Sequence, residues 1–337
     1  MKDKKQNKRI NGGHRLLFFC ILCLFGLYVA VSYAEEQPQR EQSKTKVILL
    51  HTDNLTYDQY RHPGAQILTG NVQFQHDGVL MYCDSACFYE ATNSFDAFGH
   101  VKMVQGDTLD LVGDMLLYNG LDQLARVRHN VVLTHRESKL YTDSLDYDRL
   151  YELGYFFEGG KLVDKDNVLT SDWGQYSPPT RQAVFNYNVK LENPKFTLIS
   201  DTLNYNTLTS MAEIVGPSNI DSGDNHIYSE SGFYNTQTEE AILLDRSIVT
   251  NKGRKMVGDS LYYDSKSGVG EGFRNVVYTD EVNKNMLTGN YCYYNDSTGY
   301  SMATDSAVAI DYSQRDTMYM HADTFKVYTF YMDTDSM

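Results

Sequence analysis

Asp114-Met115-Leu116-Leu117-Tyr118 is one copy of a short pattern, an acidic residue followed four positions later by an aromatic one, that recurs along the chain. The paired positions are Asp53/Tyr57, Asp84/Phe88, Asp114/Tyr118, Asp143/Tyr147, Asp172/Tyr176, Asp201/Tyr205, Glu230/Tyr234, Asp259/Tyr263 and Gly289/Tyr293. Subtracting successive first positions gives steps of 31, 30, 29, 29, 29, 29, 29 and 30 residues. A period this constant indicates a repeat protein of about nine copies.

Apolar residues alternate with polar ones around each acidic position. Two residues after it stand Leu55, Ala86, Leu116, Leu145, Gly174, Leu203, Gly232, Leu261 and Tyr291. Period-two alternation predicts strands with one buried face, and no segment has a convincing 3.6-residue period. Polar turns such as Gln105-Gly106-Asp107 and Asn251-Lys252-Gly253 separate the strands. Each copy of about 29 residues is therefore expected to contribute two short strands.

A single copy buries too little apolar surface to offset the entropy of ordering its chain, so stability must come from stacking copies. Residues 47–337 are accordingly expected to form one continuous repeat region. A tenth copy begins near Asp323, although the sequence stops at Met337. The predicted fold is all-β: an elongated, open array of the jellyroll or solenoid kind.

The N-terminus has the layout of a secretory signal peptide. A basic segment precedes an apolar stretch from Leu16 to Val31, and Ser32-Tyr33-Ala34 offers a cleavage site. Residues 1–34 are thus expected to be removed, and residues 35–46 to be a flexible lead-in. The alternative is an uncleaved anchor, which would leave the protein associated with the membrane. The predicted location is the periplasm in both cases.

Charge and cysteine content narrow the function further. The formal net charge is −14, and no basic run follows residue 46, so a nucleic-acid partner is excluded. Cys83, Cys87 and Cys292 follow the apolar stretch, and their spacing matches no zinc pattern. Cys83 and Cys87 are too far apart on one extended strand for a disulfide, which favours buried free thiols.

The order of segments in residues 47–130 resembles the OstA-like (LptA) family. Asp53-Asn54-Leu55-Thr56-Tyr57 is followed by Gly70-Asn71-Val72, and Gln105-Gly106-Asp107 follows the next copy of the strand. The repeat carries a weaker likeness to about residue 310. Gly174 and Gly232 depart from the pattern, because Leu is usual there.

The resemblance implies a periplasmic protein that carries lipopolysaccharide towards the outer membrane. It also implies partners: the acyl chains of lipopolysaccharide, and other transport components of the same fold, joined end to end by strand pairing. Self-association is expected for the same reason, since exposed end strands favour pairing. The resemblance implies neither a cofactor nor a metal.

An inward apolar face would suit such a cargo. The candidate lining residues are Val101, Leu116, Tyr118, Leu145, Tyr147, Leu203, Tyr205, Leu261 and Tyr263. The competing interpretation is that these side chains only fill a closed core. Strict alternation would place the acidic column on the same face, a costly arrangement that a bend or a hydrogen bond would relieve. A metal ladder is a further interpretation, which Glu230 and Gly289 interrupt.

Enzyme signals are weak. The histidines are scattered, and neither a nucleophile elbow nor a phosphate-binding loop occurs. We therefore do not expect an enzyme. Two alternatives to lipid transport stay open: a structural or adhesive β-solenoid of the envelope, and a β-helix carbohydrate-active enzyme with a pair of carboxylates.

Overall fold

The computed structural model describes residues 45–329, and these residues confirm the all-β prediction. They lie in one compact unit, Ser43–Met337. A single 3-10 turn, η1 (Glu90–Thr92), interrupts the strands. Within the described part of the chain, no helix has the length and apolar character needed to cross a membrane. The predicted signal peptide and most of the lead-in fall outside the described residues.

The strands are β1 (Ile48–His51), β2 (Asn54–Tyr57), β3 (Gln66–His76), β4 (Val79–Tyr89), β5 (Ser94–Gln105), β6 (Leu109–Asn119), β7 (Leu124–His135), β8 (Ser138–Asp148), β9 (Leu153–Phe156), β10 (Gly160–Asp164), β11 (Asn167–Ser171), β12 (Trp173–Ser177), β13 (Gln182–Asn193), β14 (Phe196–Asn206), β15 (Met211–Ser222), β16 (Asn225–Asn235), β17 (Glu240–Leu243), β18 (Ser247–Asn251), β19 (Arg254–Gly258), β20 (Ser260–Asp264), β21 (Val269–Asp280), β22 (Asn285–Asn295), β23 (Tyr300–Asp311) and β24 (Met318–Tyr328).

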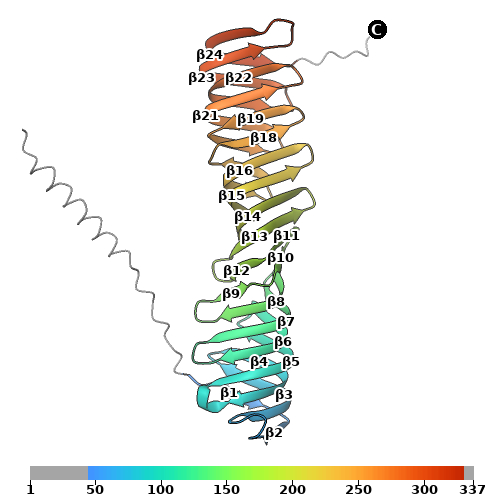
Figure 1. Cartoon of the computed structure of the whole chain (residues 1–337), viewed down its shortest axis with the longest axis vertical. Helices are drawn as coiled ribbons and strands as arrows, with labels where there is room; N and C mark the ends of the chain where they lie inside the picture. The colour runs from blue at the N-terminus through green and yellow to red at the C-terminus, as the bar shows by residue number, and fades with distance from the viewer. Residues whose placement is uncertain (1–44, 330–337) are drawn as a thin grey trace, which may run out of the picture. The chain divides into compact units, whose positions relative to one another are not determined.

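Nearly every strand pairs antiparallel with its neighbours in sequence, so the unit is one continuous meander (Figure 1). The short strands are halves of longer ones. β9 and β10 pair with the two halves of β8, while β11 and β12 pair with the two halves of β13. β17 and β18 pair with the two halves of β16. β19 and β20 pair with the two halves of β21. Each copy therefore supplies two long strands rather than the two short ones predicted.

Each long strand bends in its middle, at the acidic column. Where β13 meets β14, the register shifts between Asn186 and Val189, and the two intervening residues have positive φ. Equivalent left-handed pairs are Gly70/Asn71, Gly99/His100, His129/Asn130, Tyr187/Asn188, Arg274/Asn275 and Asp305/Ser306. Bulges of this kind bend a strand and sharpen its twist. The bend turns both halves of a strand towards the same interior.

The acidic side chains point outwards at this bend and bind the left-handed residues. Asn188 donates from Nδ2 to Asp172 at 2.6 Å, and Asn130 donates in the same way to Asp114 at 2.7 Å. Asp114 and Asp172 are both exposed. The expectation that a bend or hydrogen bond relieves the acidic column is confirmed, because strict alternation fails at the bulge. Glycine is required at Gly70, where a Cβ atom would lie 2.3 Å from an oxygen of Asp53.

Candidate functional site

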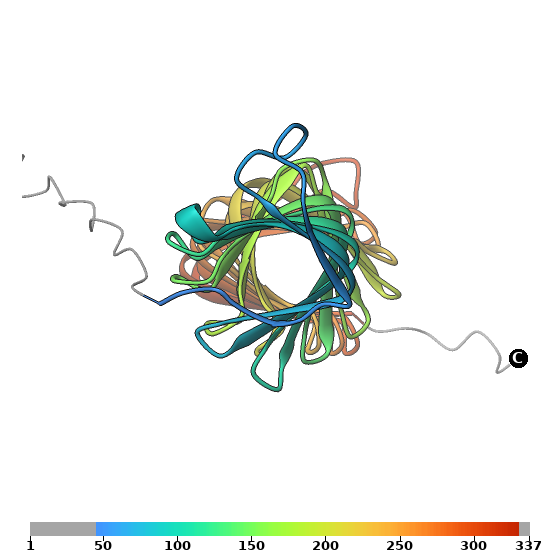
Figure 2. The same ribbon diagram turned by 90° about the horizontal axis from the view of Figure 1, so that it is seen from below.

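The bent strands surround an apolar interior that runs through the unit (Figure 2). One cluster of buried side chains extends from Val47 to Ala309 and fills it. The nine lining candidates all belong to that cluster: Val101, Leu116, Tyr118, Leu145, Tyr147, Leu203, Tyr205, Leu261 and Tyr263. None of them is more than 2% exposed. The structure thus places all nine on the inner face, where they pack against one another.

At the two glycines that depart from the repeat, neighbouring groups occupy the space that a leucine side chain would take. A Cβ atom at Gly174 would lie 2.4 Å from the ring of Phe156, which occupies the space of the usual leucine. At Gly232 a Cβ atom would meet the backbone oxygen of Ile242 at the same distance. The interior is therefore continuous through these two copies, although the side chains that line it differ.

Two rows of turns meet along one side of the interior and close it. The first row comprises residues 77–78, 106–108, 136–137, 165–166, 194–195, 223–224, 252–253, 281–284 and 312–317. The second row comprises residues 90–93, 120–123, 149–152, 178–181, 207–210, 236–239, 265–268 and 296–299. We call the line along which the two rows meet the seam. Polar side chains bridge it at most levels.

The aromatic column of the repeat supplies many of these bridges. The ring of Tyr118 is buried inside the cluster, and the Tyr118 hydroxyl lies 2.7 Å from Nδ1 of His76. Arg149 also donates to the Tyr118 oxygen. His76 Nε2 lies 3.3 Å from the carbonyl oxygen of Thr45, which can only accept, so a neutral imidazole carries its proton on Nε2 and its Nδ1 atom accepts from the Tyr118 hydroxyl. Burial lowers the pKa of His76, so the imidazole is neutral at neutral pH, as an acceptor at Nδ1 must be.

A second bridge of the same kind joins Tyr205 to Asp164. The Tyr205 hydroxyl donates to Oδ2 of Asp164 at 2.8 Å and accepts from Nδ2 of Asn167 at 2.9 Å. The other carboxylate oxygen of Asp164 accepts from Ser138 at 2.8 Å. Asp164 is 1% exposed, so these bonds satisfy a carboxylate that would otherwise be costly to bury.

Ion pairs close the seam towards the C-terminal end of the unit. Arg254 donates from Nε to Asp280 at 3.1 Å and from a terminal nitrogen to Asp296. Lys195 contacts Glu239 at 2.7 Å. Burial works against the charge of Asp280, but hydrogen bonds from Asn283 and Arg254 prevail and lower its pKa. Oppositely charged groups thus hold the two rows together where tyrosine hydroxyls do not.

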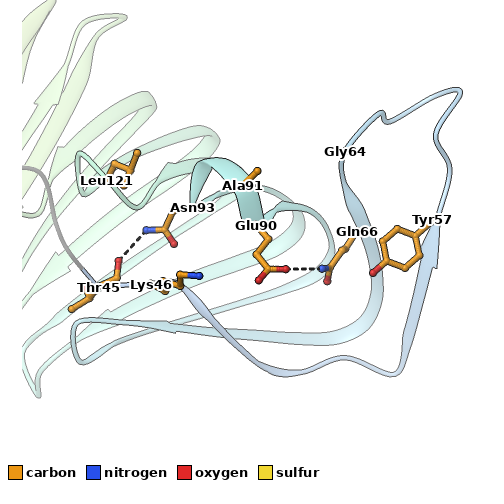
Figure 3. Close-up of a pocket in the computed structure, with 9 residues that line it drawn as sticks. All are labelled: Thr45, Lys46, Tyr57, Gly64, Gln66, Glu90, Ala91, Asn93 and Leu121. Atoms are coloured by element: carbon orange, nitrogen blue, oxygen red, sulfur yellow. Dashed lines mark hydrogen bonds between the residues drawn. The ribbon is translucent and has the colours of Figure 1, made fainter.

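At the N-terminal end the chain itself crosses the seam. Thr45 Oγ1 lies 2.9 Å from His76 Nε2, and the Asn93 amide binds the Thr45 carbonyl and the Val47 N–H at 3.1 and 2.7 Å. His76 ends a first-row strand, and Asn93 belongs to the second row. Beside this crossing is a surface pocket of about 640 Å³, whose lining includes Thr45 and Asn93 (Figure 3).

The inner apolar column was predicted from the sequence, but its polar counterpart was missed. The residue that ends each first-row strand is polar in eight consecutive copies: His76, Gln105, His135, Asp164, Asn193, Ser222, Asn251 and Asp280. Subtracting successive positions gives 29, 30, 29, 29, 29, 29 and 29 residues. This column has the same period as the acidic one, and that period would have been sufficient to find it.

At the level of Tyr147 the bridges across the seam leave two buried polar atoms without a partner. A cavity of about 520 Å³ opens between the two rows there, lined by Gln105 and His135 from one side and by Tyr147 and Arg181 from the other. The Tyr147 hydroxyl and the Gln105 Oε1 atom are buried and have no hydrogen-bond partner. Of the nine lining candidates, Tyr147 is the one that reaches this cavity.

The metal-ladder interpretation finds no support at the acidic column, where the carboxylates bind Asn and His side chains instead. Across residues 45–329 there is no group of three His, Cys, Asp or Glu side chains placed to hold a metal ion. Cys83, Cys87 and Cys292 are buried free thiols in this structure. Burial raises the pKa of Cys83 and of Cys292 to about 12, so neither is a ready nucleophile.

Comparison with known proteins points to one family. The profile described as OstA-like protein matches residues 44–201 and 195–259, together well over half of the chain. A solved structure that matches is LptH of Pseudomonas aeruginosa, described as the LptA-homologous periplasmic component of the conserved lipopolysaccharide transport device. It is 16% identical, covers 32% of this chain and 82% of its own, and has a TM-score of 0.30. No curated protein sequence matches the chain. On the family match, the chain belongs to the OstA-like protein family.

Proposed function

We propose that this protein binds lipopolysaccharide in the periplasm and carries its acyl chains within the apolar interior towards the outer membrane. The observation that carries the proposal is the unbroken inner cluster, which extends from Val47 to Ala309 through every bent strand. Membership of the OstA-like family supports the same conclusion. The protein acts by binding, and no residue is assigned a catalytic role.

Elementary energetics explain why such a cargo needs an enclosed path. An acyl chain of about a dozen methylenes costs roughly 10 kcal/mol to keep in water, at about 0.8 kcal/mol per methylene. A lipid with several chains therefore requires an apolar lining along its whole route. Leu145, Leu203 and Leu261 supply such a lining in every second copy of this stretch of the interior.

The packed interior sets a condition on this function. Because the nine lining candidates are buried, we propose that acyl chains reach them when the two turn rows move apart. The bridges across the seam are side-chain bonds, such as Tyr205 to Asp164 and Lys195 to Glu239, and they can break without unpairing any strand. Seam opening is thus the step that would admit the lipid.

Photo-crosslinking tests the proposal directly. A photoreactive amino acid at the buried Leu203 should form an adduct with lipopolysaccharide. The matched control is Asp201, two residues away in β14, whose side chain is exposed at the bend. Adducts at Leu203, Leu145 and Leu261 but not at Asp201 are the expected result. If no inward position forms an adduct, the interior is a structural core, and the envelope-solenoid alternative takes precedence.

A tether across the seam tests whether opening is required. Cysteines at Lys195 and Glu239 can be joined by a bismaleimide, since these side chains already meet at 2.7 Å. The tethered protein should lose the adduct at Leu203, whereas either single-cysteine variant treated with the reagent should keep it. Undiminished adduct in the tethered protein would show that lipid enters by another route.

The partners follow from the ends of the meander. Among residues 45–329, the outer edges of β1, β2 and β24 pair with no further strand. Unpaired edges are templates for strand addition. We propose that they join to other transport components of the same fold, or to a second copy of this chain, so that the interiors become continuous.

A further inference from the structure

The gap in the seam at Tyr147 has the chemistry of an anion site. Its lining places Arg136 on the first turn row and Arg181 on the second, one on each side of the opening. Neither guanidinium forms an ion pair or a side-chain hydrogen bond within residues 45–329, whereas Arg128, Arg149 and Arg254 all bind partners. The opening of a chain whose net charge is −14 thus holds, among the described residues, two arginines without an ion pair.

The surroundings concentrate this positive charge. His135 lines the same opening as the two arginines, and its Nδ1 atom lies 2.8 Å from the Tyr176 hydroxyl. Burial is the main cause that lowers the pKa of His135, and the positive charges of Arg181 and Arg136 lower it further. Glu152 is the carboxylate in the lining, and it is engaged by the Gln105 amide at 2.6 Å.

The cavity also offers a hydrogen-bond donor without a partner and an apolar rim. The Tyr147 hydroxyl is buried and unsatisfied, so an acceptor placed in the cavity would remove a desolvation cost. Pro178, Pro179 and Leu208 border the opening. A guanidinium binds the oxygens of a carboxylate or a phosphate in a bidentate manner, and two guanidiniums together match the charge of a phosphate monoester, which is about −1.5 to −2 at neutral pH.

We infer that this opening binds a phosphate monoester, held between Arg136 and Arg181, and that its source is the phosphorylated headgroup of an amphiphile whose acyl chains enter beside Tyr147. The inference rests on the proposed function and adds to it the position of the headgroup. A phosphate between the two arginines would bridge the turn rows beside the bond that the Gln105 amide already makes to Glu152.

Equilibrium binding to the full chain tests this inference with two probes. One is a lipid A with both phosphates, and the other is the same lipid after dephosphorylation. Wild-type protein should prefer the phosphorylated lipid by about tenfold or more, as expected for charge-assisted bonds. The R136Q/R181Q variant should lose that preference and still bind the dephosphorylated lipid. The control R61Q/R274Q makes the same charge change at exposed sites outside the cavity lining and should keep it.

The outcomes separate the inference from the function. If wild-type protein binds both lipids equally, or if R136Q/R181Q keeps the preference, the phosphate site is refuted while lipid binding stands. If wild-type protein binds neither lipid, the proposed function fails. Glucosamine 1-phosphate, a soluble phosphomonoester, then decides the site. Arginine-dependent binding of it supports a phosphate site for a soluble ligand, and its absence overturns the site as well.

Discussion

At the scale of single residues, each tyrosine of the aromatic column has an apolar ring and a polar hydroxyl, and the two have different structural roles. The rings of Tyr118, Tyr147, Tyr205 and Tyr263 pack in the interior, and several of their hydroxyls bridge the seam. Phenylalanine would fill the first role equally well. The recurrence of tyrosine is therefore explained by the polar end of the side chain, which closes the unit against water.

Tyr205→Phe should destabilise the seam by about 1–3 kcal/mol, because it removes the hydrogen bond to the buried Asp164 Oδ2 and one of the bonds of Asn167. Tyr234→Phe is the matched control: its hydroxyl is buried and makes no hydrogen bond, so its removal should cost nothing or stabilise slightly. Hydrogen exchange of the neighbouring strand amides measures the local opening free energy in each variant. Equal effects of the two substitutions would contradict the assigned bridge.

At the scale of the strand, the bend is what turns a flat meander into an enclosed interior. Two consecutive left-handed residues interrupt the register, and the side chain of the second binds the acidic residue on the neighbouring strand. Asparagine tolerates this backbone conformation better than most residues. The acidic column and the left-handed pairs thus act together, and they position both halves of a strand around the same core.

Asn188→Val should cost about 1–3 kcal/mol, because a β-branched residue is strained at φ 53° and cannot bind Asp172. Lys190→Val, on the same strand at an exposed position with ordinary backbone angles, should change stability by a few tenths of a kcal/mol at most. The denaturant midpoint of each variant provides the comparison. An Asn188→Val protein as stable as the Lys190→Val protein would refute the role given to the bend.

At the scale of the whole molecule, the described unit is a stack whose levels contact their neighbours and whose ends remain unpaired. β24 is exposed along most of its length, unlike β23, against which it pairs. Within residues 45–329 the outer side of β24 pairs with no further strand, and such an edge is a template for strand addition.

Met318→Lys with Tyr319→Lys should lower self-association measured by sedimentation velocity, because lysines on an edge strand oppose pairing. Tyr187→Lys with Val282→Lys is the control, since it replaces side chains of similar exposure (66% and 65%, against 51% and 65%) away from this edge. If both double variants associate as the parent does, the β24 edge is not the contact.

Much of this architecture could be predicted from the sequence, because a strand's alternation and a repeat's period are local properties. The inward positions of Leu116, Leu145, Leu203 and Leu261, the turn at Gln105-Gly106-Asp107 and the stacking of copies all follow from them. The orientation of the acidic column did not follow, since alternation is broken by a bulge that depends on pairing with the adjacent strand.

Only the tertiary structure shows which residues meet across the seam. Tyr118 meets His76, and Tyr205 meets Asp164, across separations of 42 and 41 residues, about one and a half repeats. Such contacts exist only once every strand has bent and the two turn rows have come together. The sequence by itself determined that an apolar inner face would form, because periodicity fixes which side chains share a face. Whether that face is covered depends on how far the halves of each strand fold towards each other, and only the assembled stack sets that angle.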